Sequence, residues 1–238
     1  MPGEKQAVRE RVWDDLEASG EARFPFPPHG RIPNFAGAEE AADRLAATPE
    51  WRAADAVKAN PDAPQLPVRR RALAEDKVVY MAVPRLREER CFVELDPATL
   101  DDPDAAATVS GMDDHGVAVR PEDLPRIDLV VAGSVAVTAD GARVGKGEGY
   151  SDLEWAVLVG FERVGPETVV ATTVHERQLV DDLPGPAAHD VPMDLVVTPE
   201  RTVRTETPYA RPTGVDWSRL DDDRAREIPV LQRLRKSS

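Results

Sequence analysis

The first regular pattern in the chain is an apolar stripe at helical spacing within residues 4–18. At about 100° per residue, one face of this segment collects its large apolar side chains, Val8, Val12, Trp13 and Leu16. Lys5 and Arg9 fall on the same stripe near its N-terminal end, whereas the acidic side chains fall on the opposite face. The pattern predicts an amphipathic helix with two inward cations, which favours an anionic partner inside the fold. The alternative is that both long side chains reach solvent at the helix end.

Short apolar runs further along the chain predict the strands of a sheet. They cover residues 77–83, 127–137, 169–174 and 195–198, with Val203 close behind the last. The second run is expected to bend at Gly133. Segments of helical character separate these runs, and apolar strands that alternate with helices are typical of a mostly parallel sheet covered on both faces.

Helices and connectors are predicted around these strands. Residues 37–58 are expected to form two helices separated at Thr48, which serves as an N-cap, and residues 152–161 a third. Residues 59–71 are predicted to be a proline-containing connector that ends in three arginines. Residues 218–238 are charged and are expected to be either a loose tail or a terminal helix.

Residues 23–36 are expected to lack regular structure, because four prolines force an extended path. Three phenylalanines and two arginines in this segment have two interpretations. They could line a pocket for a flat ring, or they could cover the hydrophobic core, and core cover is the prediction that we favour.

The composition describes a globular chain. A length of 238 residues suits one large α/β domain or two small ones. No apolar run approaches the ~20 residues of a membrane span, and the first residues carry charges in place of an apolar signal region, so a cytoplasmic protein without membrane contact is expected. The single cysteine, Cys91, excludes an internal disulfide and a cysteine-based zinc site.

The charge balance is strongly acidic, with a formal net charge of −14. Only five of the 30 basic residues are lysines, and the acidic residues are dispersed in small groups. This composition predicts a halophile's protein, since a Debye length of about 3 Å at 1 M salt weakens self-repulsion. A GC-rich genome is an alternative explanation for the excess of arginine over lysine. The acidity argues against a nucleic-acid partner, which requires a basic face.

The most informative segment is residues 144–152. Backbone N–H groups can approach an anion without an intervening Cβ at its three alternate glycines, Gly145, Gly147 and Gly149. Lys146 adds a cation within the loop, and Asp152 adds a carboxylate at its exit. The pattern predicts a phosphate-binding loop with a cation clamp and a metal ligand. The alternative is a glycine-rich hairpin without a ligand.

The loop fits neither of two common nucleotide motifs. A Walker loop requires a glycine where Asp140 stands, and a serine or threonine where Gly147 follows Lys146. The dinucleotide fingerprint requires a glycine at the position of Tyr150.

The combination of motifs resembles the 5-formyltetrahydrofolate cyclo-ligase family, also called methenyltetrahydrofolate synthetase, and in particular its branch of domain-containing proteins. The resemblance covers roughly residues 4–217. Its pieces are residues 12–14, 31–35, 83–86, 133–137, 145–150 and 152–154. It implies a three-layer, Rossmann-like α/β/α fold with a mostly parallel sheet, of the ribose-phosphate isomerase and CoA-transferase type. This domain would span residues 1–217, with a charged C-terminal tail at 218–238.

The resemblance also implies a reaction. ATP phosphorylates the formyl oxygen of 5-formyltetrahydrofolate, a neighbouring folate nitrogen attacks the activated carbon, and ADP and phosphate are released with 5,10-methenyltetrahydrofolate. Such chemistry requires phosphate positioning, charge neutralisation and Mg²⁺ more than a protein nucleophile.

Site residues follow from the resemblance position by position. Lys5 and Arg9 match the family's N-terminal pair that binds ATP phosphates, and the ATP loop is matched by Gly145, Lys146, Gly147, Gly149 and Tyr150, with Lys146 as the catalytic cation. Asp152 and Asp190 match the carboxylates that hold Mg²⁺, an oxygen-seeking cation. The alternatives are a helix N-cap for Asp152 and an ordinary turn residue for Asp190.

The chain departs from the family's pattern at three places. Ser151 stands where a second tyrosine is common, Glu148 stands where a neutral or basic residue is usual, and the folate-binding region is not recognisable, although residues 31–35 stand near its place. The alternative function is therefore a catalytically altered nucleotide-binding or interaction protein of the same fold. A sugar-phosphate isomerase is a third reading, for which no general base is identified. The four histidines are predicted to be structural, and the oligomeric state is left open.

Overall fold

The computed structural model describes residues 2–218 and 220–237. Its centre is an eight-stranded sheet in the order β12-β11-β10-β7-β3-β4-β5-β6. The strands are β3 (Ala56–Ala59), β4 (Val78–Ala82), β5 (Phe92–Leu95), β6 (Val117–Val119), β7 (Leu129–Val131), β10 (Val169–Thr173), β11 (Leu195–Val197) and β12 (Thr202–Arg204). All pairs from β11 to β4 are parallel, and the pairs at both edges are antiparallel. The predicted α/β fold with a mostly parallel sheet is confirmed.

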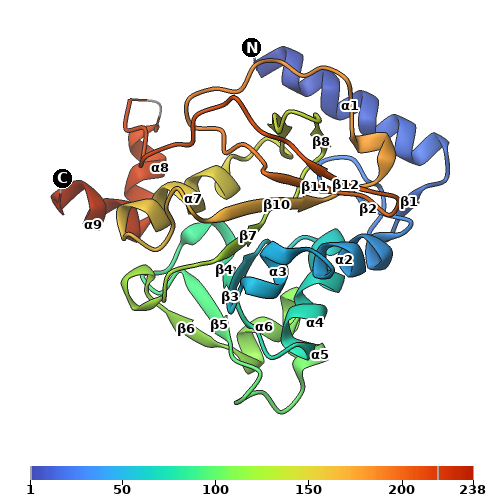
Figure 1. Ribbon diagram of the computed structural model, residues 1–238. Helices are drawn as coiled ribbons and strands as arrows, with labels where there is room; N and C mark the ends of the chain where they lie inside the picture. The colour runs from blue at the N-terminus through green and yellow to red at the C-terminus, as the bar shows by residue number, and fades with distance from the viewer. Residues whose placement is uncertain (1, 219, 238) are drawn as a thin grey trace.

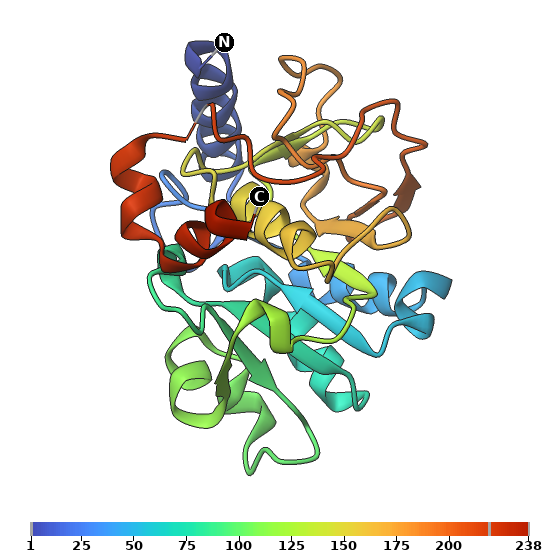
Figure 2. The same ribbon diagram turned by 90° about the vertical axis from the view of Figure 1, so that its left-hand side faces the viewer.

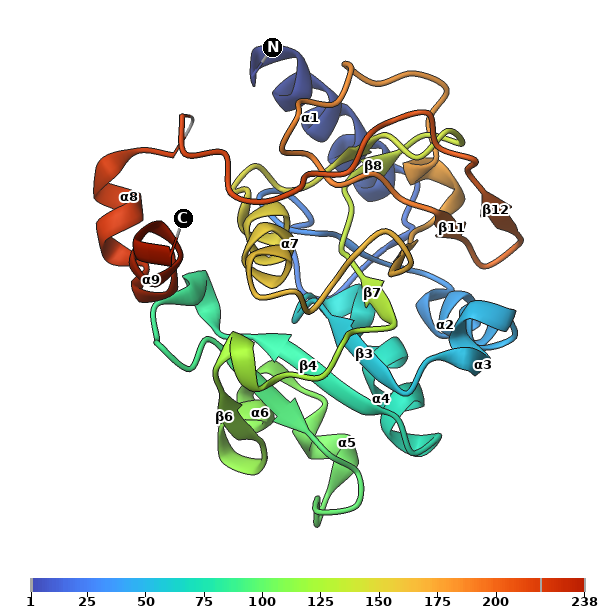
Figure 3. The same ribbon diagram turned by 60° about the vertical axis from the view of Figure 1, so that its left-hand side comes forward.

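Helices cover both faces of the sheet (Figures 1 and 3). On one face lie α2 (Ala38–Ala46), α3 (Pro49–Ala53) and α4 (Leu66–Ala74), and on the other lie α7 (Tyr150–Gly160) and α9 (Pro229–Ser237). Shorter helices are α5 (Pro103–Ala106), α6 (Val109–His115), α8 (Asp222–Glu227), η1 (Ala63–Gln65), η2 (Pro84–Leu86), η3 (Pro121–Asp123) and η4 (Glu176–Gln178). Thr48 caps α3 as predicted, because its side chain accepts a hydrogen bond from the Trp51 N–H.

The first helix, α1 (Pro2–Ala18), forms as predicted and buries its apolar stripe. Val8, Val12, Trp13 and Leu16 pack in a separate cluster with Ile32 and with the two-stranded sheet of β8 (Ala136–Val137) and β9 (Arg143–Val144). Helix α1 therefore lies beside β8 (Figure 1), and this contact carries its N-terminal cations toward the segment that follows β9.

Three predictions about local structure are wrong. The second helix of 37–58 ends at Ala53, and β3 follows it. The connector predicted at 59–71 contains the first two thirds of α4, in which Arg69 is buried. The single strand predicted at 127–137 is two strands, β7 and β8, which belong to different sheets.

The proline-rich segment does not cover the core with all its phenylalanines. Phe24 and Phe26 are 77% and 57% exposed, and only Phe35 is buried. A short antiparallel pair, β1 (Ala22–Arg23) with β2 (Asn34–Phe35), closes the ends of the segment. The core-cover prediction therefore holds for Phe35 alone.

The C-terminal segment contains α8 and α9, which Figure 2 shows beside α7. It is anchored by buried apolar side chains, Ile228, Val230, Leu231 and Leu234. None of the helices in the described part of the chain is long and apolar enough to cross a membrane.

A buried ion pair joins the centre of the sheet to α7. The Lys58 ammonium group on β3 donates to the Glu154 carboxylate on α7, and also to the Asn60 side chain at 3.1 Å. The side chains of Lys58 and Glu154 are 1% and 7% exposed. Because each charge is removed from water, each depends on the other for compensation.

We predict that Glu154→Ala lowers the free energy of unfolding by about 3–5 kcal/mol, since it leaves a buried, unpaired lysine. The double variant Lys58→Met/Glu154→Leu should recover most of this loss. Urea unfolding followed by circular dichroism measures both, and Asp223→Ala, which breaks an exposed pair with Arg226, is the control with an expected change of at most about 1 kcal/mol. Equal losses in the single and the double variant would contradict the interpretation.

Candidate functional site

A cleft of about 990 Å³ opens at the carboxyl ends of the central parallel strands. Its floor is formed by the residues that follow β3, β4 and β7, which are Asn60 to Ala63, Val83 to Arg85, and Gly133. The carboxyl edge of a parallel sheet is the usual place for a ligand in open α/β folds, because the loops after neighbouring strands converge there. The position of the cleft thus follows from the topology of the sheet.

The structure brings every predicted site residue into this one cleft. Its lining includes Lys5, Arg9, Gly145, Lys146, Gly147, Gly149, Tyr150, Asp152 and Asp190. These residues come from α1, from the loop after β9, from α7 and from the loop before β11. Segments that lie far apart in the sequence therefore converge on one loop, which we call the glycine loop (residues 145–149). The roles assigned to these residues remain predictions.

The glycine loop has a backbone shape that its glycines make accessible. Gly147 has a φ of +107°, and a Cβ there would lie 3.2 Å from Cζ of Arg9. Gly149 has a φ of +70° and is the N-cap of α7, with no side chain capping the helix. Because the first turn of a helix leaves its N–H groups without intrahelical partners, this end of α7 can hold an anion.

Arg9 reaches the glycine loop from the first turns of α1, and Lys5, one turn earlier, reaches the segment that carries Asp190. The Arg9 guanidinium group donates from Nε to the carbonyl oxygen of Gly145 at 2.6 Å. Lys5 forms an ion pair with Asp190, whose side chain is 13% exposed. Burial alone would raise the pKa of Asp190, but hydrogen bonds from Lys5 and the Ala187 N–H outweigh it and hold that pKa below its ordinary value. Asp190 is therefore ionised at neutral pH.

Lys146 is paired with carboxylates inside the loop. Its Nζ lies 3.0 Å from Glu148 and 3.9 Å from Asp62. Burial acts to lower the pKa of Lys146, but Glu148 and Asp62 raise it above its ordinary value. Glu148 stands at a position where a neutral or basic residue is usual in the family that the sequence resembles. Its carboxylate therefore neutralises Lys146, the cation that an incoming phosphate would require.

Asp152 is neither the N-cap of α7 nor free of partners. It lies in the first turn, accepts two hydrogen bonds from Nη2 of Arg143 at 3.0 and 3.2 Å, and accepts one from the Val191 N–H at 3.0 Å. Arg143 is buried and also donates to the carbonyl oxygen of Gly133. The N-cap alternative for Asp152 is wrong.

The carboxylates of the cleft suit a metal ion that is shared with a ligand. Among the residues that the structure describes, no three His, Cys, Asp or Glu side chains come together as a metal site. Mg²⁺ commonly takes only one or two protein carboxylates and completes its shell with phosphate oxygens and water. Asp152 and Asp190 each keep a lone pair beyond those used in their hydrogen bonds, so their role as ligands of such an ion stays a prediction.

Sequence reasoning missed part of the cleft floor. Asp62 follows β3 and lies beneath the glycine loop, where burial raises its pKa although Lys146, Arg69 and Lys58 oppose the shift. Arg69 is 1% exposed and donates to the carbonyl oxygens of Asn60, Asp62 and Ala107. The signal for Asp62 was present, since it follows a buried strand directly, but β3 was predicted as helix. His189, predicted to be structural, also lines the cleft.

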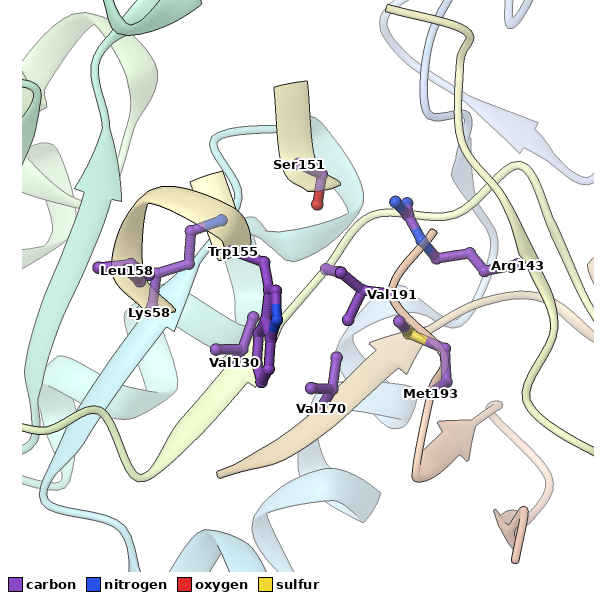
Figure 4. Close-up of a pocket in the computed structure, with 10 residues that line it drawn as sticks. Lys58, Val130, Arg143, Ser151, Trp155, Leu158, Val170, Val191 and Met193 are labelled. Atoms are coloured by element: carbon purple, nitrogen blue, oxygen red, sulfur yellow. The ribbon is translucent and has the colours of Figure 1, made fainter. Parts of the chain in front are cut away.

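A second cavity lies behind the loop, and Figure 4 shows the side chains around it. Its lining includes Ser151, Trp155, Val130 and Val170, and its volume of about 10 Å³ has room for at most one water molecule. This cavity is too small for a substrate, so the large cleft remains the candidate site.

Comparison with known proteins finds a family model and relatives that match most of the chain. The family model described as the 5-formyltetrahydrofolate cyclo-ligase family matches residues 3–199. The methenyltetrahydrofolate synthase domain-containing protein of Mus musculus is 41% identical over 98% of this chain, and that of Homo sapiens is 37% identical over 97%. The chain spans 63% and 61% of the length of these two relatives.

A solved structure shows the same fold. The NMR structure of Aquifex aeolicus 5,10-methenyltetrahydrofolate synthetase superposes with a TM-score of 0.54 at 20% sequence identity, over 87% of this chain and 95% of that one. At this identity the likeness establishes the fold alone.

We predict that Glu148→Gln strengthens binding of magnesium tripolyphosphate on the order of three- to tenfold, because it releases Lys146 from a partly exposed ion pair of about 1 kcal/mol. Isothermal titration calorimetry at constant ionic strength measures the change. Glu167→Gln removes the same charge from an exposed position outside the cleft and should leave affinity unchanged. An equal effect of both variants would assign the gain to net charge and contradict the pairing.

Proposed function

Since the chain belongs to the 5-formyltetrahydrofolate cyclo-ligase family, we propose that its cleft binds ATP and 5-formyltetrahydrofolate. The proposed reaction is the Mg²⁺-dependent cyclisation of 5-formyltetrahydrofolate to 5,10-methenyltetrahydrofolate, with release of ADP and phosphate. The observation that carries this proposal is that Lys5, Arg9 and Lys146 line one cleft at the carboxyl edge of the sheet, with Arg9 hydrogen-bonded to the glycine loop.

The cations have distinct proposed roles. Lys5 and Arg9 hold the phosphate chain from the side of α1, and the amides of the glycine loop hold it from below. Lys146 lies within the loop and neutralises charge on the transferred phosphoryl group, which is the principal contribution that a protein makes to phosphoryl transfer. When bound, Mg²⁺ would neutralise phosphate charge, with Asp152 and Asp190 as its proposed protein ligands.

The remainder of the cleft suits a flat, partly apolar substrate. Ile32, Leu66, Val83 and Val109 contribute apolar surface, and Asp62 offers a carboxylate near Lys146. A pocket with an apolar lining and few polar groups is the usual form of a site for a ring-containing ligand. Of the three phenylalanines and two arginines in the proline-rich segment, Arg31 lines this cleft, so the pocket interpretation is supported for Arg31 alone.

One observation favours a second candidate function. Lys5 and Lys146 are both neutralised by carboxylates, Asp190 and Glu148. A protein that binds nucleotide weakly and acts by contacting other proteins would tolerate these ion pairs. An efficient catalyst would have to break them at each turnover so that the lysines can bind phosphate. The second candidate is therefore a nucleotide-binding protein of this fold without cyclo-ligase activity.

The direct test mixes the purified protein in high salt with Mg-ATP and 5-formyltetrahydrofolate and follows the methenyl product by its absorbance. We expect turnover, and we expect Lys146→Ala to reduce kcat by at least about 100-fold, since it removes a charge that stabilises the transition state. Lys236→Ala removes an exposed lysine outside the cleft and should behave as the wild type. Absence of product with ATP bound would support the second candidate, and undiminished turnover in Lys146→Ala would exclude the assigned role of the loop.

A further inference from the structure

Arg224 on α8 contacts the glycine loop, and it is not among the residues that line the cleft. We propose that Arg224 is a positioning residue for nucleotide binding, and that the C-terminal helices belong to the site. The family model ends at residue 199, so this contribution comes from beyond the matched region. The proposal rests on the proposed function of the same loop, and it extends that function to a segment that the sequence left open as a tail.

Three consecutive residues meet the Arg224 side chain. Its Cζ lies 4.4 Å from the centre of the Tyr150 ring, and its Nη2 donates to the carbonyl oxygen of Glu148 at 2.7 Å. Its Nη1 lies 3.9 Å from the position that a Cβ on Gly149 would take. A planar guanidinium group can stack on an aromatic face and donate in its own plane at once, which an ammonium group cannot do.

The hydrogen bond to Glu148 sets the orientation of one peptide group. In a trans peptide the carbonyl oxygen and the following N–H point in opposite directions. Because the Glu148 oxygen is held toward Arg224, the Gly149 N–H points away from Arg224. Gly149 lines the cleft and Arg224 does not. Arg224 therefore fixes an amide in the direction from which it can donate to a phosphate.

The C-terminal helices are anchored firmly enough to act on the loop. Leu234 on α9 packs against Gly160, the last residue of α7, where a Cβ would lie 2.7 Å from Cδ2 of Leu234. Arg233 pairs with Glu122, and its guanidinium group lies 5.5 Å from the centre of the Phe161 ring. The C-terminal helices thus contact α7 at both ends, with Arg224 at its first residue and α9 at its last.

One further observation supports a polar role for Arg224. Its Nε is buried and has no hydrogen-bond partner within the described part of the chain. A buried donor without a partner is costly, and cation–π contact with Tyr150 is the compensation that the structure shows. An arginine kept for packing alone would not require its charged end in this place.

The test compares Arg224→Ala, Arg224→Lys and Arg226→Ala. Arg226 lies on the same helix and pairs with the exposed Asp223, so its variant is the matched control. We expect Arg224→Ala to weaken Mg-ATP binding and raise KM for ATP about tenfold, the usual loss for one charge-assisted hydrogen bond, with kcat and KM for 5-formyltetrahydrofolate nearly unchanged. Arg224→Lys should recover only part of the affinity, and Arg226→Ala should match the wild type.

The outcomes separate this proposal from the proposed function. Binding of Mg-ATP is measured by calorimetry and needs no turnover, so a wild type that binds ATP without forming product contradicts the catalytic proposal and still tests Arg224. Wild-type affinity in Arg224→Ala overturns the positioning role. A fall in kcat and in thermal midpoint, together with a similar rise in both KM values, also overturns it. Such a pattern describes a merely structural residue. A wild type that binds no ATP overturns both proposals.

If Arg224→Ala lowers the thermal midpoint, Arg224→Lys decides the matter. A lysine keeps the charge but cannot stack on Tyr150 and donate to the Glu148 carbonyl oxygen at once, so affinity for Mg-ATP should stay below that of the wild type even where the midpoint is restored. Wild-type affinity in Arg224→Lys would overturn the proposal.

Discussion

The structure of the cleft depends on keeping several cations close together in a strongly acidic protein. Lys5, Arg143 and Lys146 each lie beside a carboxylate, while Arg9 donates to the carbonyl oxygen of Gly145. Like charges in one partly buried site repel each other, and the paired carboxylates offset that repulsion. Under the proposed function, a polyphosphate would compete with these carboxylates for the same cations.

Beneath the cleft, the buried charge of Arg69 is compensated by hydrogen bonds to backbone carbonyl groups. Burial lowers the pKa of Arg69 to about 10, which leaves it charged at neutral pH, and three backbone carbonyl oxygens accept its hydrogen bonds. These bonds fix the turn after β3 that carries Asp62. The Lys58–Glu154 pair fixes the other side of the floor by joining β3 to α7. Both buried groups therefore act on the shape of the loops that converge on the ligand, since a buried charge imposes one geometry more strictly than an apolar contact does.

The sequence predicted those parts of the fold in which local pattern and tertiary environment agree. The apolar stripe of α1 and the two cations near its N-terminus could be predicted because the same helical periodicity puts them on one face. The strand β3 could not be predicted in this way. It has only four residues, and the third is Lys58, whose buried partner Glu154 is known only from the structure. Three consecutive arginines at 69–71 predict a solvent-exposed segment, but the tertiary fold buries Arg69. The loop residues of the cleft were predicted because they lie in a recognisable motif, whereas Asp62 depends on a strand that was missed.

The contribution of the C-terminal helices could not be read from sequence for a related reason. Nothing in the sequence indicates which residue Arg224 contacts. Its partner Tyr150 lies more than seventy positions earlier in the chain. What the structure adds is that α7 is contacted at both ends by elements outside its own loop. The interaction of an anion with a helix N-terminus falls off within the first turn, so the proposed nucleotide binding would depend on the direction of α7. Leu234 of α9 packs against the last residue of α7, and Arg224 stacks on the first. Both ends of the helix are therefore held by the C-terminal helices.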